Sequence, residues 1–233
     1  MQDCGLKVSG TKSNLVNRLQ SHLALIDLSK EKVNITAIDV GLRNLAYLSY
    51  TLSLQEDSRW SILVRDWALH DLEIESSYDL PEYVTQCHQL VKNLKTKLPD
   101  LVVMEKQMPI SVRSGMRGNY KVLVIEAILF SLLTANDLRV QSLSSLSLSK
   151  LFQLNNDQGR DYTAKKKNSI SLVKSILENE RHEDDVTVTI SEGLTEYFQS
   201  SKKKDDLADC FLIGLGSAKH YINSVNIKRE YIR

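Results

Sequence analysis

Three consecutive β-forming segments with no helix between them set the strongest limit on the fold of this chain. The segments are rich in β-branched and aromatic residues and span 33–39, 45–53 and 60–67. Further along, the helical spacing of apolar residues predicts helices at 79–97, 119–135 and 163–178. Strands are predicted to lead into Glu105 and to span 138–143. This order implies an α/β fold, a mixed five-stranded sheet flanked by helices, with 186–190 as a short strand or an extended connection.

Residues 1–28 are predicted to be a small helical unit of their own. Leu15, Leu19 and Leu23 recur at helical spacing, Gly10 precedes this helix, and Thr11 can cap it. The polar segment 29–32 then links the unit to a main domain at 33–233. An ordinary alternative is a capped helix that packs on the main domain.

Four acidic positions, far apart in the sequence, are placed where they can be aimed at one point. Asp39 follows an apolar run at the end of the first strand, and Glu105 ends a second apolar run. Asp206 and Asp209 share one face at the start of a strongly apolar final helix, with Asp205 beside them. The sequence does not decide between Asp205 and Asp206, and we favour Asp206.

Such a set of carboxylates suits Mg²⁺ or Mn²⁺ and phosphodiester hydrolysis. Two divalent ions can activate the attacking water and stabilise the leaving alkoxide. Asp39 is predicted to bridge both ions, with Glu105 on one of them and the pair Asp206 and Asp209 on the other. Glu126 is a further catalytic candidate, because it is nearly alone as an acid in the apolar helix 119–135.

Each acidic position also has an ordinary structural explanation. Asp39 can belong to a strand-ending turn, and Glu105 can lie at a solvated strand end. Asp205 and Asp206 can act only on the helix dipole, which is worth about 0.3–1 kcal/mol. Asp209 is harder to explain in this way, because it interrupts the apolar sequence 207–215. The conjunction of the acids, in this order, favours the catalytic interpretation.

Basic residues near these acids and in the first unit are candidates for contacts with DNA phosphates. The candidates are Lys12, Arg18, Lys106, Arg113, Lys165, Lys166, Lys167, Lys203 and Lys204. One of the lysines can also stabilise the transition state. The net charge of +1 indicates nothing by itself, and most lysine runs are simply solvated.

Composition narrows the class of protein. A hydrophobic content of 42% and a charged content of 25% are typical of a soluble globular protein. No uninterrupted apolar stretch approaches the roughly 18 residues of a membrane span, so we expect no membrane partner. The three cysteines lack zinc-ligand spacing and are interpreted as reduced thiols. Because the helix 119–135 is apolar almost all round, a second subunit is expected to cover part of it, which predicts a homodimer.

Two segments of the chain resemble known families. Residues 5–19 follow the pattern G-L-x-V-S-G-T-K-x-x-L-x-x-R-L and resemble the second half of a SAP motif, a helix–loop–helix DNA-binding element. Residues 33–222 resemble the RuvC-type Holliday-junction resolvases of the RNase H-like superfamily. The likeness is strongest to the fungal mitochondrial cruciform-cutting endonucleases, which also carry a SAP motif. It rests on 38–44, 103–107, 113–115 and 204–209.

The resemblance implies a homodimer that binds four-way junction DNA and nicks two opposed strands symmetrically with Mg²⁺ or Mn²⁺. It also implies dimerisation through the helix 119–135 and a role in mitochondrial DNA recombination. No transit peptide is visible in the sequence.

Two other functions compete with this one. The first is an ATP-dependent phosphotransferase of the actin or sugar-kinase type, since Asp-x-Gly turns also hold ATP phosphates. Against it, the chain has no second such loop and is short for two such domains. The second is a DNA-binding module that has no catalytic activity.

Overall fold

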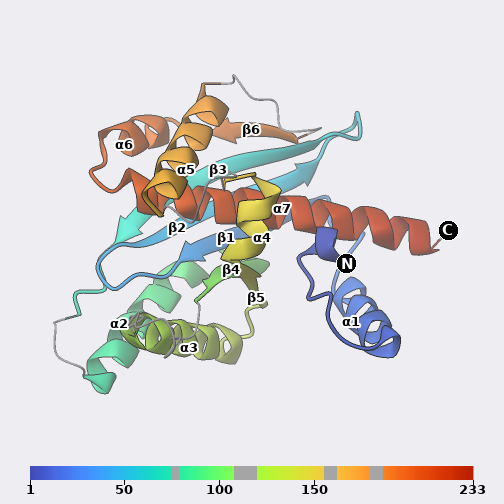
Figure 1. Cartoon of the computed structure of the whole chain (residues 1–233), viewed down its shortest axis with the longest axis horizontal. Coiled ribbons are helices and arrows are strands. Elements are labelled where there is room, and N and C mark those ends of the chain that lie inside the picture. The colour runs from blue at the N-terminus through green and yellow to red at the C-terminus, as the bar shows by residue number, and fades with distance from the viewer. Residues whose placement is uncertain (75–78, 108–119, 155–161, 179–185, 233) are drawn as a thin grey trace.

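A mixed six-stranded sheet with helices on both faces forms the body of the protein (Figure 1). The computed structural model describes residues 1–74, 79–107, 120–154, 162–178 and 186–232. Its strands are β1 (Lys32–Asp39), β2 (Leu45–Leu54), β3 (Trp60–His70), β4 (Leu101–Lys106), β5 (Val140–Ser144) and β6 (Val186–Ile190). They lie in the order β5-β4-β1-β2-β3-β6.

The pairing explains why the sheet is mixed. β1, β2 and β3 form an antiparallel meander, while β4 runs parallel to β1, β5 to β4, and β6 to β3. The predicted mixed sheet is confirmed, but the predicted count of five strands is wrong. The segment 186–190 is the sixth strand, and its residues are alternately half-buried and exposed. A segment of five residues at a sheet edge buries too little to be told from an extended connection by its pattern alone.

The helices agree with the predicted ones, with two additions. The structure contains a 3₁₀ turn (Gln2–Cys4), α1 (Lys12–Ala24), α2 (Leu80–Lys95), α3 (Tyr120–Ala135), α4 (Ser145–Leu151), α5 (Tyr162–Leu177), α6 (Leu194–Ser200) and α7 (Lys204–Ile232). The sequence did not predict α4 and α6, which have seven residues each and no repeating apolar pattern. α7 continues for 29 residues, well beyond its apolar first half.

Two hydrophobic cores lie on opposite faces of the sheet. α7 crosses one face, and α2 and α3 cover the other (Figure 1). Because successive side chains of a strand point to opposite faces, Ala37 and Val103 lie in the core under α7, whereas Ile38 and Met104 lie in the core under α2 and α3.

Gly214 allows α7 to approach the sheet closely. A Cβ at this position would collide with Leu48 of β2 and would also touch Tyr50 and Ala37. Tyr50 donates a hydrogen bond to the Gly214 carbonyl at 2.8 Å, and its hydroxyl lies 2.7 Å from that of Ser217. This contact fixes the position of α7 on the sheet.

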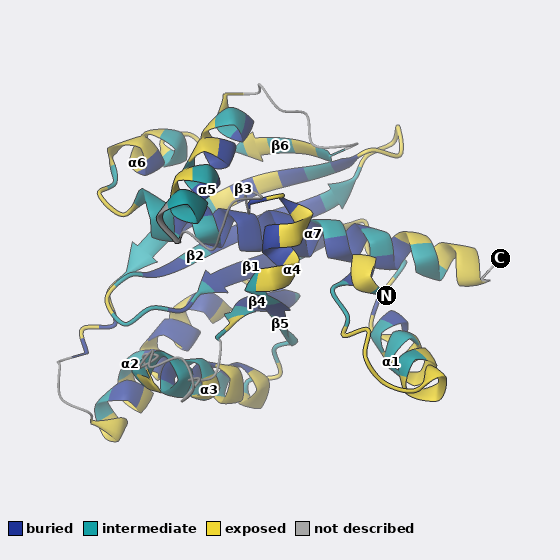
Figure 2. Ribbon diagram, viewed as in Figure 1, coloured by how far each residue is buried: buried dark blue, intermediate teal, exposed yellow. Residues whose placement is uncertain are grey.

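α3 buries only one of its faces. Ile125, Leu129 and Leu133 are fully buried, while Tyr120 and Phe130 are 48% and 39% exposed. In Figure 2, α3 accordingly carries buried, intermediate and exposed positions. Within the described residues, α3 therefore leaves two aromatic side chains exposed. Among the helices that the structure describes, none combines the length and hydrophobicity needed to cross a bilayer.

The N-terminal unit packs on the second half of α7. The predicted cap is confirmed, since Thr11 Oγ1 accepts a hydrogen bond from the backbone N–H of Asn14 at 3.3 Å. Side chains of the main domain then bind carbonyl groups at both ends of the unit. His220 Nδ1 and Asn223 donate to the carbonyl of Asp3 at 2.8 and 2.9 Å.

Contacts near the end of α1 complete this docking. Lys228 donates to the carbonyl of Ile26 at 2.6 Å, and Arg139 donates to that of Leu25 at 2.9 Å. The ring of His22 shares a hydrogen bond of 2.8 Å with Ser224. The unit 1–28 thus lies firmly against the main domain, and its relation to a SAP motif remains a prediction.

Candidate active site

Asp39 and Glu105 lie side by side at the ends of neighbouring strands. β1 and β4 are parallel, and their register pairs Ile38 with Met104, so the next residue of each strand is acidic. The alternation that puts Ala37 and Val103 under α7 also turns Asp39 and Glu105 toward α7. The two carboxyl groups interact directly, since each influences the pKa of the other.

α7 brings the other acids to the same place. Where it crosses β1, the thiol of Cys210 lies 3.6 Å from the carbonyl oxygen of Ala37. Asp209 precedes Cys210, and Asp206 lies one turn earlier on the same helix face. We use the name acidic site for Asp39, Glu105, Asp206 and Asp209.

The pKa values show that these carboxylates act on one another. Burial raises the pKa of Asp39 well above its usual range, and the negative charges of Glu105, Asp209 and Asp206 raise it further. Burial is also the largest cause of the raised pKa values of Glu105, Asp206 and Asp209. The acidic site therefore concentrates negative charge that the protein itself only partly compensates.

Lys165 of α5 supplies part of that compensation. Burial raises the pKa values of Glu105 and Asp209, and the positive charge of Lys165 opposes this rise in both groups. These three side chains line a cavity of about 20 Å³, which also has an apolar wall that includes Leu148 and Leu212. That volume is about what one water molecule requires.

Asp205 forms an ion pair with a lysine of α5. Its carboxylate pairs with Lys166 Nζ at 2.5 Å, and both side chains are mostly buried. Although burial alone would raise the pKa of Asp205, the hydrogen bond and charge of Lys166 lower it. Asp206, in contrast, contributes to the raised pKa of Asp39. This geometry favours Asp206 as the ligand, and the choice between the two stays a prediction.

Glu126 lies at the margin of the acidic site. Its Oε2 accepts a hydrogen bond from the backbone N–H of Gln107 at 3.3 Å, so α3 is tied to the chain just after β4. Burial raises the pKa of Glu126, and its charge raises the pKa of Glu105. Glu126 is thus within electrostatic reach of the site, and its catalytic role stays a prediction.

The donor set fits a hard divalent cation such as Mg²⁺ or Mn²⁺. All four groups offer carboxylate oxygens, and a cation would relieve their mutual repulsion. Within the described residues, however, no three Asp, Glu, His or Cys side chains are already arranged as a metal-binding group.

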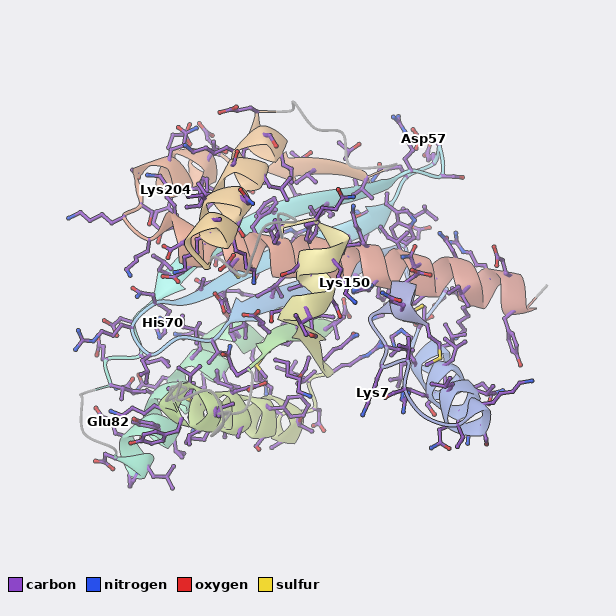
Figure 3. The ribbon with its side chains drawn as sticks, viewed as in Figure 1. Lys7, Asp57, His70, Glu82, Lys150 and Lys204 are labelled. Carbon is purple, nitrogen blue, oxygen red and sulfur yellow. The ribbon has the colours of Figure 1, made fainter. Side chains whose placement is uncertain are left out.

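The predicted DNA contacts fall into two groups. Lys106, Lys165, Lys166, Lys167, Lys203 and Lys204 lie on β4, α5 and the chain that leads into α7. Lys12 and Arg18 belong to α1, and Figure 3 shows the two regions on opposite sides of the view, with Lys204 labelled in one and Lys7 in the other. Arg113 lies outside the described residues.

Arg18 stabilises the loop that precedes α1. Its guanidinium donates hydrogen bonds to the carbonyls of Lys7 and Ser9, at 2.6 and 3.3 Å, and so holds the loop before α1. Lys12, by comparison, is exposed at the start of the helix. Contacts of both residues with DNA remain predictions.

Two features of the site were not foreseen from the sequence. Ser169 of α5 is fully buried beside Asp209, and only its place in the apolar row of α5 hints at this. The turn after β1 needs a glycine at position 41, because a Cβ there would lie 2.8 Å from the carbonyl oxygen of Asn44.

Comparisons with known proteins agree with this arrangement. Residues 35–227 match the protein family described as mitochondrial resolvase Ydc2 / RNA splicing MRS1. A search of curated proteins found no match. The yeast mitochondrial Holliday junction resolvase Ydc2 has a similar structure, with a TM-score of 0.65 and 21% identity over 99% of this chain and 95% of that one.

Two structures of Thermus thermophilus RuvC are also similar. One has 13% identity, and the other, in complex with a Holliday junction substrate, has 14%. Each has a TM-score of 0.50, and the match covers 80% of this chain and 94% of RuvC. At these identities the likeness shows a shared fold, while the family match spans most of the sequence. The chain belongs to the mitochondrial resolvase Ydc2 / RNA splicing MRS1 family.

Proposed function

We propose that this protein is an endonuclease that resolves four-way DNA junctions by paired, symmetric nicks. The observation that carries the proposal is the convergence of Asp39, Glu105, Asp206 and Asp209 at one end of the sheet. Convergent carboxylates whose negative charge is only partly balanced by nearby lysines suit metal-assisted cleavage of a phosphodiester. The family of the chain includes a resolvase, and a protein of similar fold has been seen with a Holliday junction substrate.

The acidic site would hold Mg²⁺ or Mn²⁺. When bound, such ions supply an activated water and stabilise the leaving oxygen. Asp39 would take the central position, because its charge interacts with the other three acids. Lys165, between Glu105 and Asp209, would stabilise the charge that develops on the reacting phosphate.

The basic residues near the acidic site would hold the DNA backbone. Lys106 and Lys203 are exposed, and Lys167 is exposed on α5. Phosphate contacts of this kind fix the orientation of a duplex and make binding depend on salt. Lys12, on the N-terminal unit, would provide a more distant contact, in keeping with the SAP-like sequence.

Symmetric nicking of two strands requires two acidic sites, so we infer a homodimer. The exposed aromatic residues of α3, Tyr120 and Phe130, support dimerisation through this helix, together with its strongly apolar sequence. The family name also supports a mitochondrial location and a role in recombination of mitochondrial DNA.

The family name includes an RNA-splicing protein, which offers a second candidate function. The acidic site favours cleavage over RNA binding alone, because binding a nucleic acid does not need four converging carboxylates. The kinase-type alternative finds no support in the family match.

A cleavage assay on a synthetic four-way junction tests the proposal. Wild-type protein should nick two opposed strands with Mg²⁺ and should leave a matched linear duplex uncut. Asp39→Asn should lose cleavage while it still binds the junction. As a matched control, Asp137→Asn removes an exposed acid from the turn after α3 and should cleave normally.

Three outcomes would contradict the proposal. They are ATP hydrolysis without DNA, tight binding of structured RNA without junction cleavage, or cleavage by Asp39→Asn at the wild-type rate.

A further inference from the structure

Trp67 of β3 is hydrogen-bonded to the first turn of α7. Its indole Nε1 donates to the carbonyl oxygen of Leu207 at 3.1 Å, and the side chain is buried. Leu207 directly follows Asp206 and lies two residues before Asp209. A helix carbonyl already accepts a bond from the N–H four residues later, so Trp67 supplies a second bond, which the two lone pairs of the oxygen allow. The bond therefore holds the backbone between two residues of the acidic site.

Two aromatic rings hold the indole of Trp67 in place. Phe198 of α6 stacks on it, with 4.9 Å between the ring centroids and 16° between the ring planes, and Phe211 of α7 lies at 5.2 Å. Both of these rings are buried, and α6 lies beside the first turns of α7 (Figure 1). Because packed rings enclose the indole, its N–H points in one direction and acts as a fixed donor.

We propose that Trp67 is a positioning residue that sets the rotation of the first turn of α7, and with it the carboxylates of Asp206 and Asp209 for metal binding. A side-chain atom lies roughly 5–6 Å from the helix axis, so a rotation of about 10° would move it by about 1 Å. That displacement is large beside the Mg²⁺–oxygen distance of about 2.0–2.1 Å. The inference rests on the proposed function for the metal, and it adds a residue from a strand that carries no part of the acidic site.

Other contacts hold α7 at different places or through flexible groups. Tyr50 binds α7 about two turns after Leu207. The ion pair of Lys166 and Asp205 joins two side chains, which can change rotamer while the helix turns. Trp67, in contrast, binds the backbone of the first turn itself. Loss of its N–H should therefore allow the first turn to rotate while the rest of α7 stays on the sheet.

A simpler explanation is that Trp67 only fills space in the core under α7. Replacement of Trp67 by 3-benzothienylalanine separates the two explanations, because this analogue keeps the shape of the indole but has sulfur in place of the N–H. Trp67→Phe is a second variant, which keeps an aromatic ring between Phe198 and Phe211 and also lacks the donor. Trp60→Phe is the matched control, because it makes the same change at the other end of β3, where Trp60 is also buried.

Binding of Mn²⁺ to the protein without DNA is the primary measurement, followed through the electron paramagnetic resonance signal of free Mn²⁺. The analogue at position 67 should weaken Mn²⁺ binding about 10-fold, at the lower end of the range for groups that orient metal ligands. Trp67→Phe should weaken it at least as much, and Trp60→Phe should match wild type. Thermal unfolding is measured alongside, because a general loss of stability lowers Tm but leaves the Mn²⁺ affinity of the folded protein unchanged.

The outcomes distinguish this inference from the proposed function. If wild type cleaves junctions and the analogue binds Mn²⁺ as tightly as wild type, the positioning role is wrong and the function stands. The same conclusion follows if Trp60→Phe weakens Mn²⁺ binding as much as the analogue does. If wild type binds Mn²⁺ and the analogue weakens that binding, but no junction is cut, the positioning role stands and the proposed function is wrong. A wild-type protein that binds no Mn²⁺ would contradict both.

Discussion

The docking of the N-terminal unit makes the stability of the protein depend on the protonation of His22. This side chain lies between α1 and α7, where its ring bonds Ser224. Burial lowers the pKa of His22 from 6.5 to about 4, and the nearby charges of Arg139 and His220 contribute to the shift. His22 is therefore neutral in the folded protein at neutral pH.

The sign of the effect follows from proton uptake. Between pH 6.5 and 4, the unfolded chain binds a proton at His22 that the folded protein does not, so acidification favours unfolding. The full shift corresponds to about 3 kcal/mol at 1.36 kcal/mol for each pKa unit. Because the side chain is partly exposed, we expect about 2 kcal/mol after solvent screening. The entropy of unfolding for a chain of this length, about 0.5 kcal/mol per kelvin, converts this into a change of roughly 4 °C in Tm.

Thermal unfolding of wild type and His22→Gln from pH 7 to pH 4 measures this contribution. Glutamine can still bond Ser224 but does not titrate, so the variant should lose about 4 °C less than wild type on acidification. His88→Gln, at an exposed position of α2, is the matched control and should behave as wild type. Other groups also titrate in this range, so only the difference between variant and wild type is interpreted. Parallel Tm curves for wild type and His22→Gln would refute the reasoning.

Three further predictions concern the acidic site and the helix that carries half of it. Burial and mutual repulsion raise the pKa values of Asp39, Glu105, Asp206 and Asp209, so the folded protein without metal keeps protons that the unfolded chain releases above about pH 4. Its stability should therefore fall as the pH rises through these values. At pH 8, Mg²⁺ at about 100 times its Kd should restore roughly 3 kcal/mol, or about 6 °C in Tm, and should have little effect on Asp39→Asn. Gly214→Ala should cost about 1–3 kcal/mol in urea unfolding, because the added methyl group overlaps Leu48; a change below about 0.5 kcal/mol would contradict the close contact. In junction cleavage, Asp206→Asn should lose activity and Asp205→Asn should keep most of it, and the reverse pattern would assign Asp205 as the ligand.

Most of the sheet could be predicted because its strands follow simple patterns. The meander of β1, β2 and β3 is made of uninterrupted β-forming runs, and β4 is a short apolar run that follows a helix. The structure of the segment 186–190 was ambiguous in the sequence, because this segment forms a strand by pairing with β3, which is distant in the sequence. α4 and α6 were missed because each has only seven residues, too few for a repeating pattern.

The acidic site could be predicted in part because two of its residues lie in strands with simple patterns. Asp39 and Glu105 each end an apolar strand, and strand alternation alone turns both toward the face that α7 covers. Asp205 and Asp206 are adjacent, so the sequence could not separate them. The choice depends on Lys166, which reaches Asp205 only because α5 packs on α7.

The position of bound Mn²⁺, located by anomalous diffraction from crystals of the wild-type protein, tests the central claim most directly. The account predicts Mn²⁺ between the ends of β1 and β4 and the start of α7, with ligand oxygens from Asp39, Glu105, Asp206 and Asp209. Mn²⁺ bound only elsewhere on the protein, with Asp39 and Asp209 making no contact to it, would contradict the account.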